Sequence, residues 1–246
     1  MRNYSVRDWI EQNKYLIFVI YYTLYMVGFV LVENRTPAHL YVIHCPLDQY
    51  IPFLEIFVIP YILWFFYIGG IVLWMGIFDR DNMCRLLWSG MVGMTIFLLI
   101  SWFLPNGLDL RPTAFERDNI FVWITRTFIY GSDTPTNVFP SIHVNNSICA
   151  CVAVLASDRL KDRKVVRGAS VIMAGLIVLS TMFLKQHSVV DVSAGMITAW
   201  LSCEICFADA LKTWKESLFY PTGRGSLSYQ PAVRGPIKKN YPKVSH

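Results

Sequence analysis

Long runs without a charged residue alternate along this chain with short segments rich in Arg, Lys, Asp and Glu. A bilayer core about 30 Å thick needs about 20 apolar residues in helical form, so runs of that length predict membrane-spanning helices. The runs lie at 15–32, 56–78, 86–108, 134–157, 168–184 and 189–208, the last interrupted only by Asp191 and Glu204. The pattern therefore predicts an all-α fold, a six-transmembrane helical bundle.

The composition agrees with a membrane protein. Hydrophobic residues make up 54% of the 246 residues and charged residues only 16%, which argues against a disordered chain, a coiled coil or an ordinary soluble enzyme. The net charge of +5 is not arranged as a basic stripe with interleaved aromatic residues, so nucleic acid is not an expected partner. Most of the six cysteines lie in apolar runs, where Cys behaves as a small hydrophobe rather than as part of a disulfide framework.

Lys and Arg are distributed unevenly between the two sides of the predicted bundle. Most of the 22 basic residues lie at the two ends of the chain and in the loops after the second and fourth spans, and cytoplasmic loops carry such an excess. We therefore expect cytoplasmic termini, with the remaining loops on the outer face of the plasma membrane. Residues 1–216 form the predicted membrane catalytic domain, and 217–246 a flexible basic tail attracted to anionic lipids.

The outer connection between the third and fourth spans, 105–139, is long for a loop without structure. Apolar residues recur at helical spacing between Arg117 and Arg126 and shortly beyond. This pattern predicts an interfacial amphipathic helix in the long outer loop. A helix that plugs the end of the bundle is an equal alternative.

Two histidines are predicted to lie at the same membrane face. His143 opens the fourth span and His187 the sixth, and the chain crosses the membrane twice between them. Asp191 follows His187 by four residues and so lies on the same side of a helix. A carboxylate beside an imidazole fixes its tautomer and stabilises the imidazolium form. One histidine can then act as a nucleophile and the other as a general acid.

Three more residues at that face are candidates for binding phosphate. Arg111 and Lys185 are cations, and Ser141 stands at a helix N-terminus, where free N–H groups attract anions. Phosphoryl transfer through a covalent phosphohistidine requires such a set, and it needs no cofactor because the side chains supply the positive charge. A metal site built from the two histidines and the aspartate is the alternative, although no H-E-x-x-H spacing is present.

These residues resemble the three sequence blocks of the type-2 phosphatidic acid phosphatase superfamily, K-x6-R-P, P-S-G-H and S-R-x5-H-x3-D. The matching segments are P-N-G-L-D-L-R-P at 105–112, P-S-I-H at 140–143 and S-T-M-F-L-K-Q-H-S-V-V-D at 180–191. The resemblance implies a metal-independent membrane lipid phosphatase or phosphotransferase. It implies His187 as the nucleophile, Asp191 as its partner and His143 as the acid, with Arg111 and the region of Ser141 binding phosphate.

Three positions depart from the family pattern. Leu104 stands where the family has Lys, Thr181 where it has Arg, and Ile142 where it has Gly. Lys185 is our candidate to replace one missing cation, a substitution that resembles the branch of inositol phosphoceramide and sphingomyelin synthases. Fewer fixed cations favour a phosphodiester donor or a phosphotransferase over a doubly charged monoester.

Two other features of the sequence are interpreted as structural. His44, Cys45 and Asp48 lie together in the first outer loop, and we expect loop packing rather than a metal site there. Gly195 lies one turn beyond Asp191 and predicts a close approach of another helix.

We therefore expect an integral membrane lipid phosphatase that hydrolyses a lipid phosphate or diphosphate through a phosphohistidine at the outer face. The first alternative is a phosphotransferase that moves a phospho-headgroup to a lipid alcohol, as an inositol phosphoceramide synthase does. The second is an inactive protein that binds or transports lipid phosphates. Phosphatidic acid, phosphatidylglycerol phosphate and polyprenyl diphosphate are all compatible substrates, and no oligomeric state is indicated.

Overall fold

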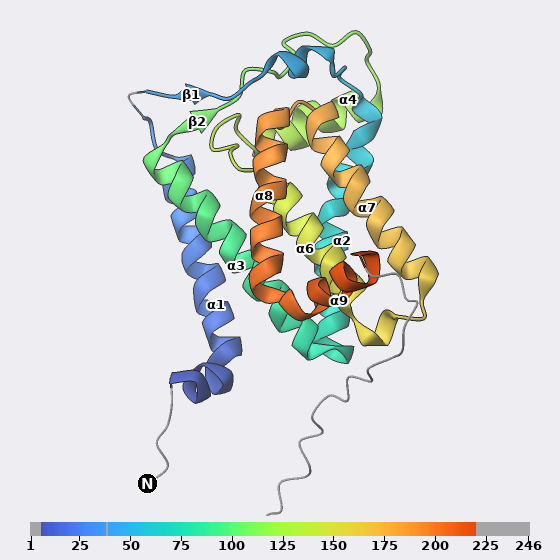
Figure 1. Ribbon diagram of the computed structural model, residues 1–246. Coiled ribbons are helices and arrows are strands. Elements are labelled where there is room, and N and C mark those ends of the chain that lie inside the picture. Colours follow the sequence, from blue (N-terminus) through green and yellow to red (C-terminus); the bar gives the residue numbers. More distant parts are fainter. Residues whose placement is uncertain (1–5, 38, 220–246) are drawn as a thin grey trace, which may run out of the picture. The chain divides into compact units, whose positions relative to one another are not determined.

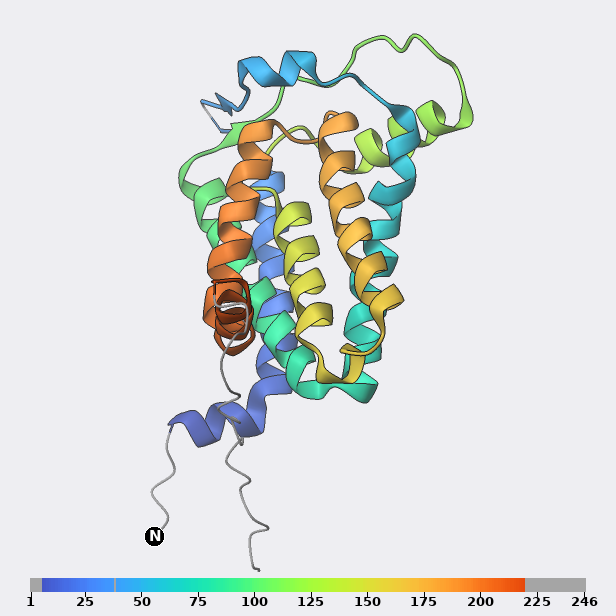
Figure 2. The same ribbon diagram turned by 45° about the vertical axis from the view of Figure 1, so that its right-hand side comes forward.

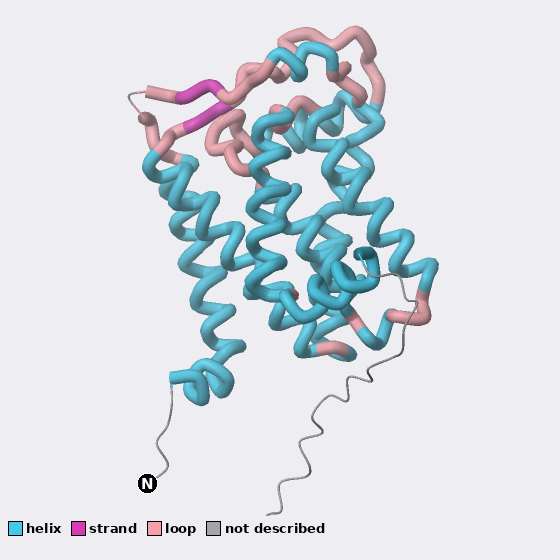
Figure 3. Tube along the Cα trace, in the orientation of Figure 1, coloured by secondary structure: helices cyan, strands magenta, loops and turns pink. Residues whose placement is uncertain are grey.

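The computed structural model of the protein describes residues 6–37 and 39–219, which are mainly helical (Figure 1). The α-helices are α1 Val6–Glu33, α2 Val58–Phe78, α3 Arg80–Phe103, α4 Ile120–Ile124, α5 Tyr130–Ser132, α6 Ile142–Ala156, α7 Lys164–Phe183, α8 Val189–Cys206 and α9 Ala208–Phe219. The 3-10 helices are η1 Pro46–Tyr50, η2 Glu55–Phe57 and η4 Asp158–Leu160, the π-helical turn is η3 Thr125–Ile129, and the two short strands are β1 Tyr41–Val42 and β2 Asn106–Gly107. Figure 3 shows how little of the described chain is strand, so the helical class is confirmed.

The chain divides into two compact units, 1–211 and 212–246. The second unit is described only as far as Phe219, where α9 ends. The predicted basic tail at 217–246 therefore lies almost entirely outside the described residues. Every feature of the site discussed below belongs to the first unit.

Within the described residues, five helices are long and apolar enough to cross a membrane, one fewer than the six spans predicted. They are Asn13–Glu33, Glu55–Phe78, Arg80–Phe103, Lys164–Phe183 and Val189–Cys206. The run at 134–157 forms only the shorter apolar helix α6, with 15 residues. Pro140 removes a backbone donor, and the hydroxyl of Ser141 accepts the N–H of Val144 as the helix cap, so α6 begins late in the run. A count of six spanning helices is thus not confirmed.

Helix α6 is the central helix of the first unit. It packs against α2, α3, α7 and α8, while α1 packs against α3 (Figure 2). Because protein surrounds it, α6 can be short and can carry buried small and polar side chains. These include Asn145, Ser147, Ala150 and Ala153.

Glycines permit the close packing of α6 against its neighbours. A Cβ added at Gly195 would lie 2.8 Å from the carbonyl oxygen of Ser141 and 2.9 Å from Cβ of Val144. A Cβ at Gly93 would overlap the side chain of Asn145. The close helix approach predicted at Gly195 is therefore confirmed, and it brings the N-terminal ends of α6 and α8 together.

The two strands tie together the two connections that the sequence analysis predicts on the outer face, and the names first outer loop and long outer loop keep that predicted position. β1 and β2 pair in parallel, with Tyr41 opposite Asn106. The side-chain oxygen of Asn106 accepts the N–H groups of Val138 and Phe139 at 2.8 and 2.9 Å. A single buried amide therefore joins the segment before Arg111 to the segment before α6.

The helix predicted between Arg117 and Arg126 is present as the consecutive elements α4, η3 and α5. Val122 and Ile129 are buried, and Ile129 packs in a cluster with residues of α2 and with Leu184. Other apolar side chains, Ile120, Trp123 and Phe128, are exposed. Its position at a membrane interface stays a prediction.

Candidate active site

The two histidines of the sequence motifs lie close together at one end of the bundle. His143 is in the first turn of α6, and His187 directly precedes the cap of α8. The backbone N–H of Ser141 donates to the carbonyl oxygen of Asp191 at 3.2 Å, which joins the starts of both helices. The two imidazole centroids are 5.8 Å apart. The expectation that topology brings both histidines to one level therefore agrees with the structure.

Asp191 is placed to orient the His187 ring. Its Oδ2 lies 3.5 Å from Nδ1 of His187 and also accepts the backbone N–H of Ser188 at 2.8 Å, within a capping box. Asp191 is fully buried and His187 is 8% exposed. A proton on Nδ1 directed at this carboxylate leaves the lone pair of Nε2 available for attack.

A tight turn positions His187 between α7 and α8. The backbone N–H groups of Gln186 and His187 both donate to the carbonyl oxygen of Thr181, at 2.9 and 3.0 Å. Lys185 has a φ of 53°, in the left-handed region, which closes the turn at the end of α7. Ser188 then caps α8 by accepting the N–H of Val190.

Arg111 reaches the same turn from the long outer loop. Its guanidinium donates to the carbonyl oxygen of Asp133 at 2.8 Å and to the side-chain oxygen of Gln186 at 2.7 Å. It also lies over the ring of Tyr130, at 4.6 Å from the centroid. Burial lowers the pKa of Arg111, but nearby Asp133 opposes this shift, and a guanidinium keeps its charge in proteins. The sequence analysis did not identify Gln186, whose one signal in the sequence is its position directly before His187.

The other two predicted phosphate ligands have different partners. The Lys185 ammonium donates to the carbonyl oxygens of Asp48, at 2.8 Å, and of Ile51, so it faces the first outer loop. Burial lowers the pKa of Lys185, and the charge of Asp48 opposes this. The hydroxyl of Ser141 caps α6. Among the three, Arg111 is the one that contacts a side chain of the His187 turn.

Asp48 supports the His187 turn from the first outer loop. Its carboxylate is 2% exposed and accepts hydrogen bonds from the Ser188 hydroxyl at 2.6 Å, the Val189 N–H at 2.8 Å and the Cys45 N–H at 2.7 Å. Burial alone would raise the pKa of Asp48, but these hydrogen bonds hold it below its ordinary value. The sequence indicated loop packing for Asp48, and its main partners turn out to follow His187 directly.

Several buried polar atoms at this site have no hydrogen-bond partner within the described part of the chain. They are Nε of Arg111, Nε2 of Gln186, Nδ1 of His187 and Oδ1 of Asp191. Nδ1 of His187 faces the Asp191 carboxylate at 3.5 Å, whereas Nε of Arg111 and Nε2 of Gln186 are donors with no acceptor among the described residues. Buried donors are paired in nearly all native structures, so these two indicate a place where a ligand with acceptor oxygens binds.

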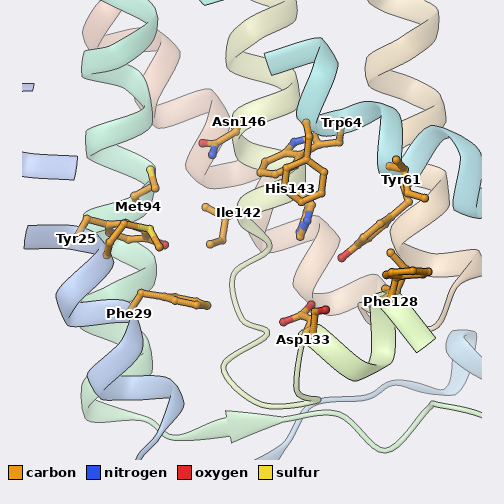
Figure 4. A pocket seen from close by; sticks show the side chains of 15 residues that line it. Tyr25, Phe29, Tyr61, Trp64, Met94, Phe128, Asp133, Ile142, His143 and Asn146 are labelled. Atoms are coloured by element: carbon orange, nitrogen blue, oxygen red, sulfur yellow. The ribbon is translucent and has the colours of Figure 1, made fainter. Parts of the chain in front are cut away.

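An apolar cavity of about 620 Å³ lies on the other side of His143, bounded by α1, α2, α3 and α6. Figure 4 shows the His143 ring and the Asp133 carboxylate directed into it, together with the hydroxyl end of Tyr61. The rings of Tyr61 and Trp64 pack on His143, with centroids 4.9 and 4.5 Å away. His143 thus stands between His187 and the cavity.

No group of three or more His, Cys, Asp or Glu side chains among the described residues is arranged to hold a metal ion. The arrangement instead offers an oriented imidazole, a second imidazole, a buried guanidinium and a helix N-terminus. These are groups that can bind a phosphate and transfer it.

Comparison with known proteins supports this interpretation. No curated protein and no solved structure is found to match the chain. A sequence model described as the PAP2 superfamily matches residues 87–215, which is more than half of the chain. The match includes Arg111, His143, His187 and Asp191. The chain therefore belongs to the PAP2 superfamily.

Proposed function

We propose that the protein is a lipid phosphatase that hydrolyses a lipid phosphate or diphosphate through a phosphohistidine at His187. Superfamily members are generally phosphatases or phosphotransferases, and the five helices of the described chain that are apolar enough to cross a membrane fit an integral membrane enzyme. The observation that carries the proposal is the pairing of His187 with buried Asp191, 5.8 Å from the ring of His143.

In the first step Nε2 of His187 attacks phosphorus. The bond between phosphorus and the lipid oxygen breaks, and the electron pair stays on that oxygen, which takes a proton from His143. Asp191 stabilises the positive charge that develops on the His187 ring. Arg111 neutralises the phosphoryl oxygens, so the proposed chemistry requires no metal ion.

In the second step water attacks the phosphohistidine. His143, now neutral, takes a proton from this water, and the bond between phosphorus and Nε2 breaks with its electron pair returning to His187. Inorganic phosphate leaves, and both histidines return to their starting states. The position of His143 between His187 and the cavity supports one residue serving as acid and then as base.

The cavity beside His143 supports a lipid substrate. Its lining is dominated by aromatic and aliphatic side chains, and Met26, Phe65 and Phe128 are exposed at its edge. A hydrocarbon chain bound there would place its ester oxygen on the side of His143 that must deliver the proton. We therefore assign the cavity to the lipid part of the substrate.

We also propose that the site faces the outside of the plasma membrane and that the termini are cytoplasmic. The α7–α8 turn, β1 and β2 lie at one end of the bundle (Figure 1). The basic segment 159–167, before and at the start of α7, lies at the other end. Because basic loops stay in the cytoplasm, this polarity supports an outward-facing site.

A phosphotransferase similar to inositol phosphoceramide synthase is the second candidate. The Lys185 ammonium is held by the carbonyl oxygens of Asp48 and Ile51, so it does not compensate for the cations that the family pattern has at Leu104 and Thr181. Fewer cations favour a phosphodiester donor over a doubly charged monoester. A lipid alcohol in the cavity would then replace water in the second step.

The test uses purified protein in detergent with EDTA and a panel of lipid phosphates, diphosphates and phosphodiesters. We expect phosphate release from wild-type protein and from His44→Ala, an exposed outer-loop control, and no release from His187→Ala. Headgroup transfer only after addition of a lipid alcohol would identify the transferase instead. Loss of all activity in EDTA with recovery on adding a divalent cation would contradict the metal-independent mechanism, and binding without turnover would leave a lipid-phosphate binding protein.

A further inference from the structure

The carboxylate of Asp133 projects into the apolar cavity beside His143 (Figure 4). Its backbone is held on both sides: its N–H donates to the carbonyl oxygen of Ile129 at 3.0 Å, and its carbonyl oxygen accepts from Arg111 at 2.8 Å. These contacts fix the backbone position from which the side chain enters the cavity. No described residue donates a hydrogen bond to the carboxylate itself.

An unpaired carboxylate is costly in such surroundings. Burial raises the pKa of Asp133, and the charges of His187 and Arg111 oppose that shift only in part. A partly buried acid without a donor loses hydration that nothing in the cavity replaces. A bound ligand that carries a hydrogen-bond donor would restore the missing interaction.

The cavity contains other buried polar atoms without a partner among the described residues. The Tyr25 hydroxyl and Nε1 of Trp64 are both in its lining, and neither makes a hydrogen bond. A ligand made only of hydrocarbon would leave all of them unpaired. The cavity therefore suits a lipid with polar groups close to its reacting end.

The position of Asp133 relative to His143 indicates which part of the substrate it contacts. A carboxylate repels a phosphate group, whereas Arg111 attracts it. The Arg111 guanidinium contacts the backbone carbonyl oxygen of Asp133 and the side chain of Gln186, while the Asp133 carboxylate projects away into the cavity. The alcohol half of the ester lies on the cavity side, where His143 protonates its oxygen. Asp133 therefore faces the carbon atoms next to the ester oxygen.

We infer that Asp133 accepts a hydrogen bond from a hydroxyl or amide N–H group carried by the lipid beside its phosphate ester. This inference rests on the proposed function and names its substrate class. Lipid phosphates with a free hydroxyl or an amide next to the ester carbon are preferred. Fully esterified glycerol phosphates and polyprenyl phosphates lack that donor and are bound less tightly.

The test measures binding of phosphonate analogues, in which a methylene group replaces the ester oxygen so that no cleavage occurs. Three analogues share one hydrocarbon chain and differ at the neighbouring carbon, which carries a hydroxyl, an acylamino group or hydrogen. Dissociation constants are measured for wild type, Asp133→Ala, Asp133→Asn and the exposed acidic control Asp118→Asn. Comparison of the hydroxyl analogue with the acylamino analogue shows which of the two donors Asp133 binds.

Wild-type protein and Asp118→Asn are expected to bind at least one donor analogue about tenfold more tightly than the hydrogen analogue, as for a hydrogen bond to a charged group. Asp133→Ala loses this preference, and Asp133→Asn, which keeps an acceptor oxygen, retains part of it. The Asn variant decides the question if the Ala variant does not fold.

Equal binding of all three analogues to wild type, or a preference that survives in Asp133→Ala, would overturn the inference. The analogues are not cleaved, so this result does not depend on turnover. A preference lost in Asp133→Ala, combined with no phosphate release from any true ester, would instead support the subsite and contradict the proposed enzymatic function.

Discussion

Replacing Asp48 by alanine tests whether the first outer loop holds His187 in its reactive position. The carboxylate is buried and accepts hydrogen bonds from Cys45, Ser188 and Val189 at 2.6 to 2.8 Å. Two of these donors follow His187 directly in the chain. Alanine would therefore leave the start of α8 without its support.

The expected loss of stability follows from the three hydrogen-bond donors that would lose the Asp48 carboxylate. A buried donor left without a partner costs about 1–3 kcal/mol, and the Ser188 hydroxyl can rotate toward another acceptor, so we expect a loss of about 2–5 kcal/mol in the free energy of unfolding. A shift of about 1 Å at a reacting group lowers rates by about 100-fold. We expect a fall of that order in kcat, with KM nearly unchanged because the contacts of Arg111 do not include Asp48.

The assay compares kcat, KM and thermal unfolding in detergent for Asp48→Ala and Glu55→Ala. Glu55 is a matched control because its buried carboxylate also supports an outer connection, accepting from Arg117 at 3.0 Å and Asn119 at 2.9 Å. It has no hydrogen bond to the His187 turn among the described contacts. Glu55→Ala should lose stability and keep most of its kcat. Equal losses of kcat in both variants, or a wild-type kcat in Asp48→Ala, would refute the positioning role.

The same interaction has a defined pH dependence. Hydrogen bonds hold the pKa of Asp48 in the folded protein below its ordinary value of 3.8. The resulting stabilisation is fully present above that pH and is lost as the pH falls through the lower folded-state value. The difference in unfolding temperature between wild type and Asp48→Asn should therefore narrow in acid, and a difference that widens there would contradict this sign.

Three further substitutions test other contacts of the site. Arg111→Lys cannot keep both hydrogen bonds and the stacked geometry of the guanidinium, so KM for the lipid phosphate should rise about tenfold in steady-state assays. Gly195→Ala forces α8 away from Ser141, and both the unfolding temperature and phosphate release should fall, with overpacking costing about 1–3 kcal/mol. Lys185→Gly keeps the left-handed turn without the ammonium, so kcat should fall while KM stays constant. A raised KM would instead assign that ammonium to phosphate, as the sequence analysis expected.

The spans were predictable because their signal is local. The composition of a charge-free run of about 20 residues is enough to predict a membrane-spanning helix, and five of the six runs correspond to long apolar helices of the described chain. The run at 134–157 predicted a full span because it contains no charged residue, but its first residues include Thr, Pro and Asn that are not helical. Its first residues, as far as Pro140, form an irregular connection in which Asn137 has a φ of 52°, and enclosure by four neighbouring helices lets the remaining α6 be short.

The placement of the candidate catalytic residues was predictable for a topological reason. A chain that crosses the bilayer twice between His143 and His187 must return to the same face, and a spacing of four residues places Asp191 beside His187. The contacts of Lys185 and Asp133 were not predictable in this way. Each depends on how an outer loop folds back over the bundle, and the Lys185 contacts join residues more than 130 positions apart.

The packing of the spans and the contacts of the loops determine the geometry of the site on different length scales. Packed spans bring side chains to one level of the bundle, but the distance between a nucleophile and a phosphate must be set more finely than that. Here the first outer loop contacts both halves of the site: β1 pairs with the strand that leads to Arg111, and Asp48 binds the residues after His187. These connections thus form one hydrogen-bonded framework around the turn that carries His187. Changes in that framework should therefore alter kcat more than equally destabilising changes on the exposed faces of the spans.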